Sequence, residues 1–225
     1  MQKLGRIDFR STLLLAFALL ATGNEQKHTQ QSIARPSIFE IEHSCKATEG
    51  SLRTEDLTVL DFRIGSSTIG DVQKRFPGID PVELTKEEEA ETGICIKNQE
   101  GEAVIFATSV MGAPKGTLTS IYLAPAVLVE RARLTCKSVK LPPKMFSSKS
   151  CIRVGATAAQ VSKLVRAKLP TEGSFCTAYE IASSQGLLQE NKSAKLRGFT
   201  DSTGAEGDFS KGKLEWIKLF GITSN

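Results

Sequence analysis

The sequence predicts an α+β fold made of two tandem modules, each with a helix packed on a three- or four-stranded antiparallel sheet. Three observations predict it: the chain repeats internally, each copy contains a capped helix, and short strands follow each helix. With 225 residues, the chain has room for one large domain or two small ones. Its 40% hydrophobic and 24% charged residues are typical of a folded protein and exclude a fully disordered chain.

Residues 1–23 have the pattern of a secretory signal peptide. Three basic residues precede an apolar run at 13–21, and the small residues of Ala21-Thr22-Gly23 predict cleavage before Asn24, with Ala16-Phe17-Ala18 as a second site. The alternative is a retained membrane anchor, but a spanning helix needs about 20 apolar residues and this run is shorter. No cysteine lies near the cleavage site, so we expect no lipid anchor.

Cleavage leaves a chain that we expect to be periplasmic or secreted. Residues 24–36 are rich in Gln, Thr and Ser and are predicted to be a flexible leader. After cleavage, residues 24–225 carry 26 basic and 24 acidic residues, and this nearly neutral balance argues against a nucleic-acid partner and against electrostatic binding to an anionic membrane. The two histidines, His28 and His43, leave little material for histidine catalysis or a histidine metal site.

The body of the chain is predicted to be an internal duplication, with module 1 at 37–128 and module 2 at 129–225. Four short matches recur in the same order, at offsets of 89 to 96 residues. They are Cys45-Lys46-Ala47 with Cys136-Lys137-Ser138, Phe62–Gly65 with Ile152–Gly155, Thr68–Val72 with Thr157–Val161, and Gly116–Leu123 with Gly212–Leu219.

Each copy is expected to contain one helix that begins after a glycine turn and a capping residue. These residues are Gly65, Thr68 and Asp71 in the first copy, and Gly155, Thr157 and Gln160 in the second. One apolar face of each helix should pack on a sheet: Ile69, Val72 and Phe76 form the first face, and Val161, Leu164, Val165 and Leu169 the second. Pro77-Gly78 and Pro170 should end the two helices.

Strands are predicted after each helix, from apolar runs and from alternating patterns such as that of Ser174–Ala182. The predicted strands are Ile94–Lys97, Ala103–Val110 and Leu118–Leu123 in the first copy, and Ser174–Ala182, a segment near Leu196–Thr200, and Leu214–Phe220 in the second. The run Lys86–Glu91 is expected to be a solvated helical turn or loop. A cation site is the alternative, and it is disfavoured because contiguous carboxylates repel one another and do not converge.

The five cysteines suggest disulfide bonds in an exported protein, with at least one thiol left over. If the copies are equivalent, the bridges are Cys45–Cys95 and Cys136–Cys176, with Cys151 free. A local alternative is a Cys136–Cys151 bridge, in which Cys151 replaces Cys176 as the partner of Cys136. No metal-binding or redox spacing is present, so we expect a structural role for these cysteines, no metal site and no cofactor.

Structural roles are expected first for the other candidate sites. In His43-Ser44-Cys45, adjacent residues on a strand would point to opposite faces, so a catalytic pair is not expected. Gly112–Gly116 is predicted to be a hairpin loop. Gly204–Asp208 is predicted to be a surface turn, because the spacing of its acidic residues is incomplete for a calcium-binding loop. Tyr122 and Trp216 occupy matching segments; packing is the first expectation for both, and a protein-binding surface is the second.

The helix of pattern Gly-x-Thr/Ser-x-x-x-Val at Gly155, which has one more residue after the glycine at Gly65, is followed by consecutive strands and resembles the small exported bacterial modules of the BamE (SmpA/OmlA) type. Its tandem duplication resembles the β-lactamase-inhibitor proteins. The resemblance implies a helix layer on an antiparallel sheet and a role in envelope assembly or protein binding. The lipidated cysteine of the BamE type is missing, which puts an outer-membrane scaffold role in doubt.

Together these features predict an exported, non-enzymatic protein that binds another macromolecule in the cell envelope, with an unknown protein as partner and inhibition as one mode of action. The alternatives are a structural envelope component, and a hydrolase-type enzyme whose site residues are scattered among loops.

Overall fold

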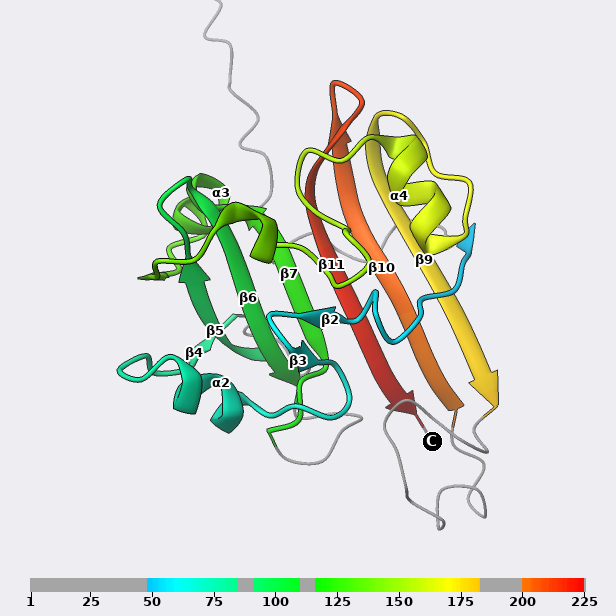
Figure 1. The fold of residues 1–225 in the computed structure, drawn as a ribbon. Coiled ribbons are helices and arrows are strands. Elements are labelled where there is room, and N and C mark those ends of the chain that lie inside the picture. Colours follow the sequence, from blue (N-terminus) through cyan, green and yellow to red (C-terminus); the bar gives the residue numbers. More distant parts are fainter. Residues whose placement is uncertain (1–47, 85–90, 110–115, 183–199, 225) are drawn as a thin grey trace, which may run out of the picture. The chain divides into compact units, whose positions relative to one another are not determined.

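The strands of both halves form one continuous mixed sheet. The computed structural model describes residues 48–84, 91–109, 116–182 and 200–224. In this part of the chain the sheet has nine strands, in the order β1-β9-β10-β11-β7-β6-β5-β4, and β8 pairs with β5 away from this path (Figure 1). The strands are β1 (Thr48–Glu49), β4 (Val82–Glu83), β5 (Glu91–Lys97), β6 (Glu102–Ser109), β7 (Ser120–Pro125), β8 (Lys137–Ser138), β9 (Gly173–Ala182), β10 (Thr200–Ser210) and β11 (Lys213–Ser224).

The expected division into two modules, each with its own small sheet, is therefore wrong. β11 of the second half pairs with β7 of the first, from Ile217 opposite Leu123 to Phe220 opposite Ser120. The short strands cross between the halves as well, because β8 lies parallel to β5 and β1 lies parallel to β9. An unpaired strand edge exposes backbone N–H and C=O groups, and joining the two edges satisfies these groups. The expected boundary at 128–129 falls inside a helix.

The helices are short. They are α2 (Ile69–Arg75), α3 (Ala126–Arg131), α4 (Ala158–Val165) and the 3₁₀ turn η1 (Pro143–Met145). The capping predictions are confirmed, since Thr68 with Asp71 and Thr157 with Gln160 both form reciprocal capping boxes. The second helix ends earlier than Pro170 predicted, because Arg166 adopts a left-handed conformation directly after α4. α3 was not predicted.

The two glycine turns have matching local geometry. Gly65 and Gly155 both have φ of 80°. Gly65 N–H donates to Leu118 C=O and Gly155 N–H donates to Leu214 C=O, each at 2.8 Å. Each turn is thereby bonded to a late segment of its own half, Leu118 just before β7 and Leu214 on β11. The local similarity between the copies thus reaches the backbone hydrogen bonds, although the sheet is shared.

The two faces of the sheet carry separate hydrophobic clusters. On one face, here called the front face, α2, α4 and the hairpin β2 (Thr58–Val59) to β3 (Phe62–Arg63) pack over the large core. Phe106 lies in this core and is fully buried. The back face carries a smaller cluster under α3, built on Cys95, Ile105 and neighbouring side chains. Phe62 makes an edge contact with Phe106, with ring centroids 5.1 Å apart, and so joins the hairpin to the sheet.

Candidate functional site

Tyr122 and Trp216, the two predicted binding residues, lie on the back face of the sheet. Tyr122 is on β7 and Trp216 on the adjacent strand β11. Tyr122 is 2% exposed and Trp216 is 6% exposed, and both belong to the cluster under α3. The structure brings the two aromatic side chains to one face, and it packs them into a core instead of presenting them on the surface.

A polar cluster surrounds Tyr122. Its hydroxyl donates a short hydrogen bond to the Glu91 carboxylate on β5. Ser120 Oγ donates to the same carboxylate at 2.9 Å, and Lys218 Nζ lies 3.1 Å from it. Lys218 Nζ also lies 5.2 Å from the centroid of the Tyr122 ring. β7 and β11 therefore place polar groups around one buried carboxylate on β5.

The electrostatics of this cluster keep Tyr122 protonated. Burial raises the pKa of Tyr122 well above its ordinary value, and the charge of Glu91 and the hydrogen bond to Glu91 raise it further. Glu206, opposite Lys218 on β10, adds a smaller effect of the same sign. A phenol held in this state donates a hydrogen bond and does not accept a proton. The cluster is therefore suited to anchoring the back face, and it supplies no general base at Tyr122.

Glu91 is a residue that sequence reasoning assigned wrongly. It was expected in a solvated turn, yet it opens β5 and is 8% exposed. The rest of that acidic run lies outside the described residues. The signal that could have identified Glu91 is its position three residues before Ile94, where the apolar run of the strand begins.

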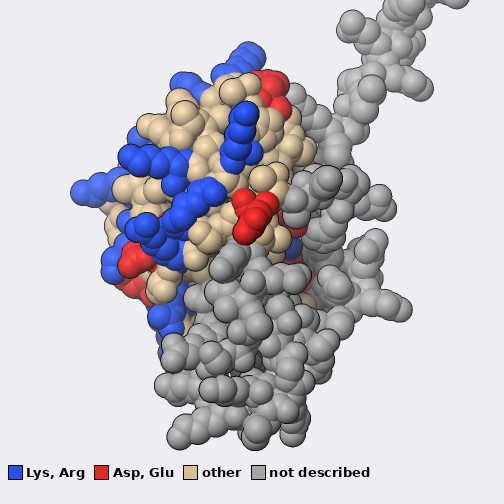
Figure 2. Space-filling model, turned by 90° about the vertical axis from the view of Figure 1, so that its right-hand side faces the viewer, with Lys and Arg blue, Asp and Glu red and all other residues tan. Residues whose placement is uncertain are grey.

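A second feature is a segregation of charge along the chain. Between Glu130 and Glu172 the sequence contains ten Lys or Arg residues and no Asp or Glu. Nine of the ten are exposed: Arg131, Arg133, Lys140, Lys144, Lys149, Arg153, Lys163, Arg166 and Lys168. Figure 2 shows a side of the molecule on which Lys and Arg outnumber Asp and Glu over the described residues.

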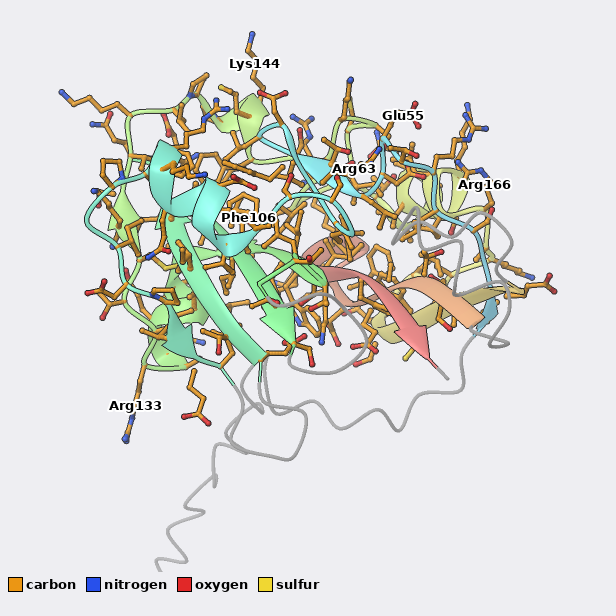
Figure 3. All side chains as sticks on the ribbon, turned by 90° about the horizontal axis from the view of Figure 1, so that it is seen from below. Glu55, Arg63, Phe106, Arg133, Lys144 and Arg166 are labelled. Carbon is orange, nitrogen blue, oxygen red and sulfur yellow. A yellow bond between two sulfur atoms is a disulfide. The ribbon has the colours of Figure 1, made fainter. Side chains whose placement is uncertain are left out.

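The exposed cations from Lys140 to Lys168 lie on elements of the front face, and we call this set the basic face (Lys140, Lys144, Lys149, Arg153, Lys163, Arg166 and Lys168). Figure 3 shows Lys144, Arg63 and Arg166 projecting from one side of the sheet and Arg133 from the other. Arg166 pairs with the buried Asp56 at 3.4 Å. The other six form no ion pair with a carboxylate of the described residues.

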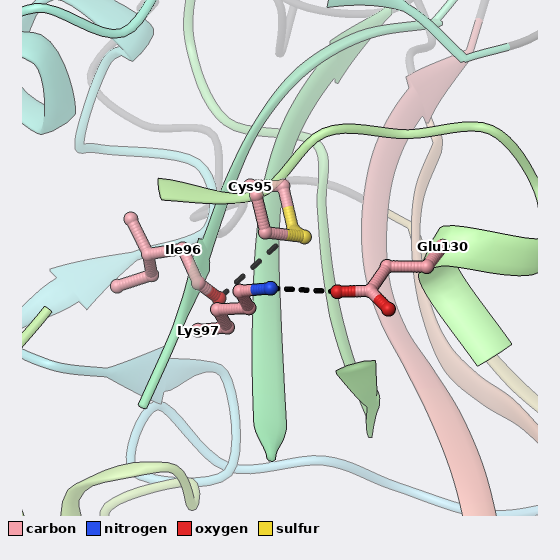
Figure 4. The surroundings of a disulfide bond; sticks show 5 residues. Cys95, Ile96, Lys97 and Glu130 are labelled. Atoms are coloured by element: carbon pink, nitrogen blue, oxygen red, sulfur yellow. Dashed lines mark hydrogen bonds and ion pairs between the residues drawn. A yellow bond between two sulfur atoms is a disulfide. The ribbon is translucent and has the colours of Figure 1, made fainter. Parts of the chain in front are cut away.

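The cysteines join distant parts of the chain. Cys95 and Cys136 form a disulfide with their Cα atoms 4.5 Å apart and a sequence separation of 41 residues, beside the ion pair of Lys97 with Glu130 (Figure 4). Cys176 is also in a disulfide, Cys151 is free and exposed, and Cys45 lies outside the described residues.

The expected bridges of Cys95 and Cys136 are therefore wrong, both those derived from repeat equivalence and the local alternative of Cys136 with Cys151. The physical reason is the crossing of β8, which lies parallel to β5 with Lys137 opposite Ile96. This register sets Cys136 next to Cys95 in the neighbouring strand.

The remaining candidates gain no support as sites. Gly204–Asp208 is part of β10 and not a surface turn, since it pairs with β9. A Cβ at Gly204 would lie 2.1 Å from the backbone oxygen of Thr177, so a glycine is needed at this close contact. In the described part of the chain no three His, Cys, Asp or Glu side chains gather as metal ligands. His43-Ser44-Cys45 and most of Gly112–Gly116 lie outside it. No described helix is long and apolar enough to cross a membrane.

No protein-family model, curated protein or solved structure matches this chain. The resemblance to the BamE type and to the β-lactamase-inhibitor proteins therefore stays a prediction.

Proposed function

We propose that the protein is exported, has no catalytic role, and binds a partner in the cell envelope through its basic face. Where the partner is a protein, inhibition is one mode of action. The observation that carries this proposal is the segregation of charge, with ten basic and no acidic residues from 131 to 171 in a chain of 29 basic and 25 acidic residues.

The basic face is suited to attracting an anionic surface. Six exposed cations without carboxylate partners among the described residues sum to a positive potential, which speeds the encounter with a negatively charged partner. The same charges exposed to water add little to folding stability, so folding alone does not account for them.

The scaffold holds these cations in fixed positions. The backbone N–H of Lys149 donates to Thr58 C=O at 2.7 Å, which ties the loop to the front hairpin. Lys163 lies on the exposed side of α4, while Val161 and Val165 on the other side are buried in the core. Binding would therefore order little of the backbone, which lowers its entropic cost.

Export has two supports of different kinds. The Cys95–Cys136 disulfide is typical of an oxidising compartment. The pattern of residues 1–23 is that of a signal peptide. Periplasmic and secreted destinations both fit these features.

Capture of a partner tests the function. The protein lacking residues 1–23, immobilised through its C-terminus, should retain a component of envelope extract at low salt and release it as the salt concentration rises, because salt screens exposed charges. A double substitution, K144A/K149A, should weaken capture, and R131A/R133A should not. Repeated capture of nothing, or equal capture by both variants, would contradict the proposal.

A further inference from the structure

We infer that the partner of the basic face is a membrane surface rich in anionic phospholipid headgroups. This inference rests on the proposed function and names the partner class. Three features of the basic face support it: the kind of cation it carries, the apolar turn that lies between two of its lysines, and the lack of an exposed aromatic ring in the segment 131–171.

The cations of the face are mainly lysines, with five Lys and two Arg. Arg166 is already engaged by Asp56 and by the backbone oxygen of Ser51. Lysine is depleted at protein–protein interfaces, where Arg and aromatic residues dominate. Lysine near an anionic membrane gains attraction as a point charge without needing a fixed partner geometry. The composition thus favours a lipid surface over a folded protein.

An apolar turn lies between two of these lysines. Pro142 and Pro143 at the start of η1 are exposed, and Leu141 and Met145 are half-buried against the core. Lys140 precedes this turn and Lys144 lies within it. Apolar groups flanked by lysines suit the boundary between headgroups and acyl chains, where the apolar part leaves water and the ammonium groups meet phosphate.

The face lacks the features that nucleic acids use. The segment 131–171 contains one aromatic residue, Phe146, which is 2% exposed, so no exposed ring is available for base stacking. Exposed carboxylates also occur on the front face, where Glu55 precedes the hairpin and Asp61 lies in its turn, whereas Glu83, Glu100 and Glu130 lie on other elements.

Vesicle co-sedimentation tests the inference with the full mature chain. The probes are vesicles of phosphatidylcholine alone and vesicles of phosphatidylcholine mixed with phosphatidylglycerol. The protein should bind the mixed vesicles, and high salt should release it. K144A/K149A should weaken binding by about 30-fold, from about fivefold for each lysine. The matched control R131A/R133A removes two exposed cations and should bind like the unmodified protein.

Three results would overturn the inference. One is the absence of binding to the phosphatidylglycerol vesicles, another is an equal loss in both variants, and the third is tighter binding to a random duplex DNA at the same salt concentration. The envelope capture experiment separates this from the broader proposal. If K144A/K149A loses a captured protein and no vesicle binding is seen, the lipid class is wrong and the binding function stands. All substituted side chains are exposed, and circular dichroism checks that both variants fold.

Discussion

The carboxylate of Glu91 receives polar groups from two other strands. Tyr122 and Ser120 on β7 donate to it, and Lys218 on β11 supplies the opposite charge. A buried carboxylate is stable only when its charge is neutralised and hydrogen-bonded. The cluster therefore stabilises the contact between β7 and β11, which is where the two halves of the sheet meet.

We expect Y122F to lower the free energy of unfolding by about 1–3 kcal/mol, because it removes a hydrogen bond to a buried charged group. Urea unfolding measures this loss. The comparison is E130Q, which breaks the surface pair of Lys97 with Glu130 and should cost less than about 1 kcal/mol. Equal losses in the two variants would show that the Tyr122 hydrogen bond contributes no more than a surface contact.

Tyr122 should also make the protein sensitive to alkaline pH. Its pKa is raised in the folded protein, so above the ordinary tyrosine pKa of 10.0 the unfolded chain loses this proton while the folded protein keeps it. Stability therefore falls as pH rises above this value, by about 1.4 kcal/mol per pH unit from this one group. Y122F should show a shallower decline in urea unfolding between pH 9 and pH 11, about one unit either side of the ordinary tyrosine pKa. Parallel declines would contradict the assignment.

Individual side chains show which parts of the site were predictable. Packing was the first expectation for Tyr122 and Trp216, and both are buried. The acidic neighbours of Glu91 suggested that its side chain would be exposed to water. The side chain is instead buried against the sheet, where it accepts a hydrogen bond from Tyr122 and pairs with Lys218. Those partners come from strands 31 and 127 residues away in sequence, so no local pattern could show them.

At the scale of elements, the two-residue strand β8 depends on the disulfide that precedes it. Cys136 is bonded to Cys95, and the adjacent Lys137 and Ser138 pair with Ile96 and Lys97. A pairing of two residues is too short to hold by its own hydrogen bonds. The covalent bond supplies the proximity that the strand needs.

We expect C95S/C136S to lower the free energy of unfolding by about 4 kcal/mol, from the entropy of closing a loop of 41 residues. Chemical denaturation of the variant measures it. C151S is the control and should have little effect, because Cys151 is exposed and free. A loss of the same size in the control would mean that replacing cysteine by serine is itself destabilising, and that the loss does not report on the Cys95–Cys136 bridge.

Local elements were predictable where local chemistry determines them. The capping boxes at Thr68 and Thr157 depend on residues three apart, and both predictions are confirmed. Five predicted strands overlap strands of the sheet for most of their length, and the sixth, near Leu196–Thr200, lies outside the described residues except for Thr200. The pairing of β8 with β5 and of β11 with β7 depends on contacts across the chain, and the similarity between the copies pointed to the wrong arrangement.

At the scale of the whole molecule, the shared sheet should unfold as one cooperative unit. Trp216, the single tryptophan, lies on β11 beside the junction with β7, while most of the helices lie on the front face. Its fluorescence and the far-ultraviolet circular dichroism should follow the same denaturation curve. Two separated transitions would show that the halves fold independently in spite of the common sheet.

The net charge of the whole chain gave no indication of the basic face. The chain as a whole has a formal charge of +4, which indicated no anionic partner. The segment 131–171 alone carries ten positive charges, and acidic residues elsewhere offset them. A count taken over short windows would have found the segment, although its position on the front face required the fold.

The Cys95–Cys136 bridge encloses β6, β7 and α3 in a covalent ring. A single protease cut at any peptide bond inside that ring leaves both fragments attached to each other. Such a nicked molecule would migrate near its intact mass on a non-reducing gel and would separate into two bands only after a reducing agent is added.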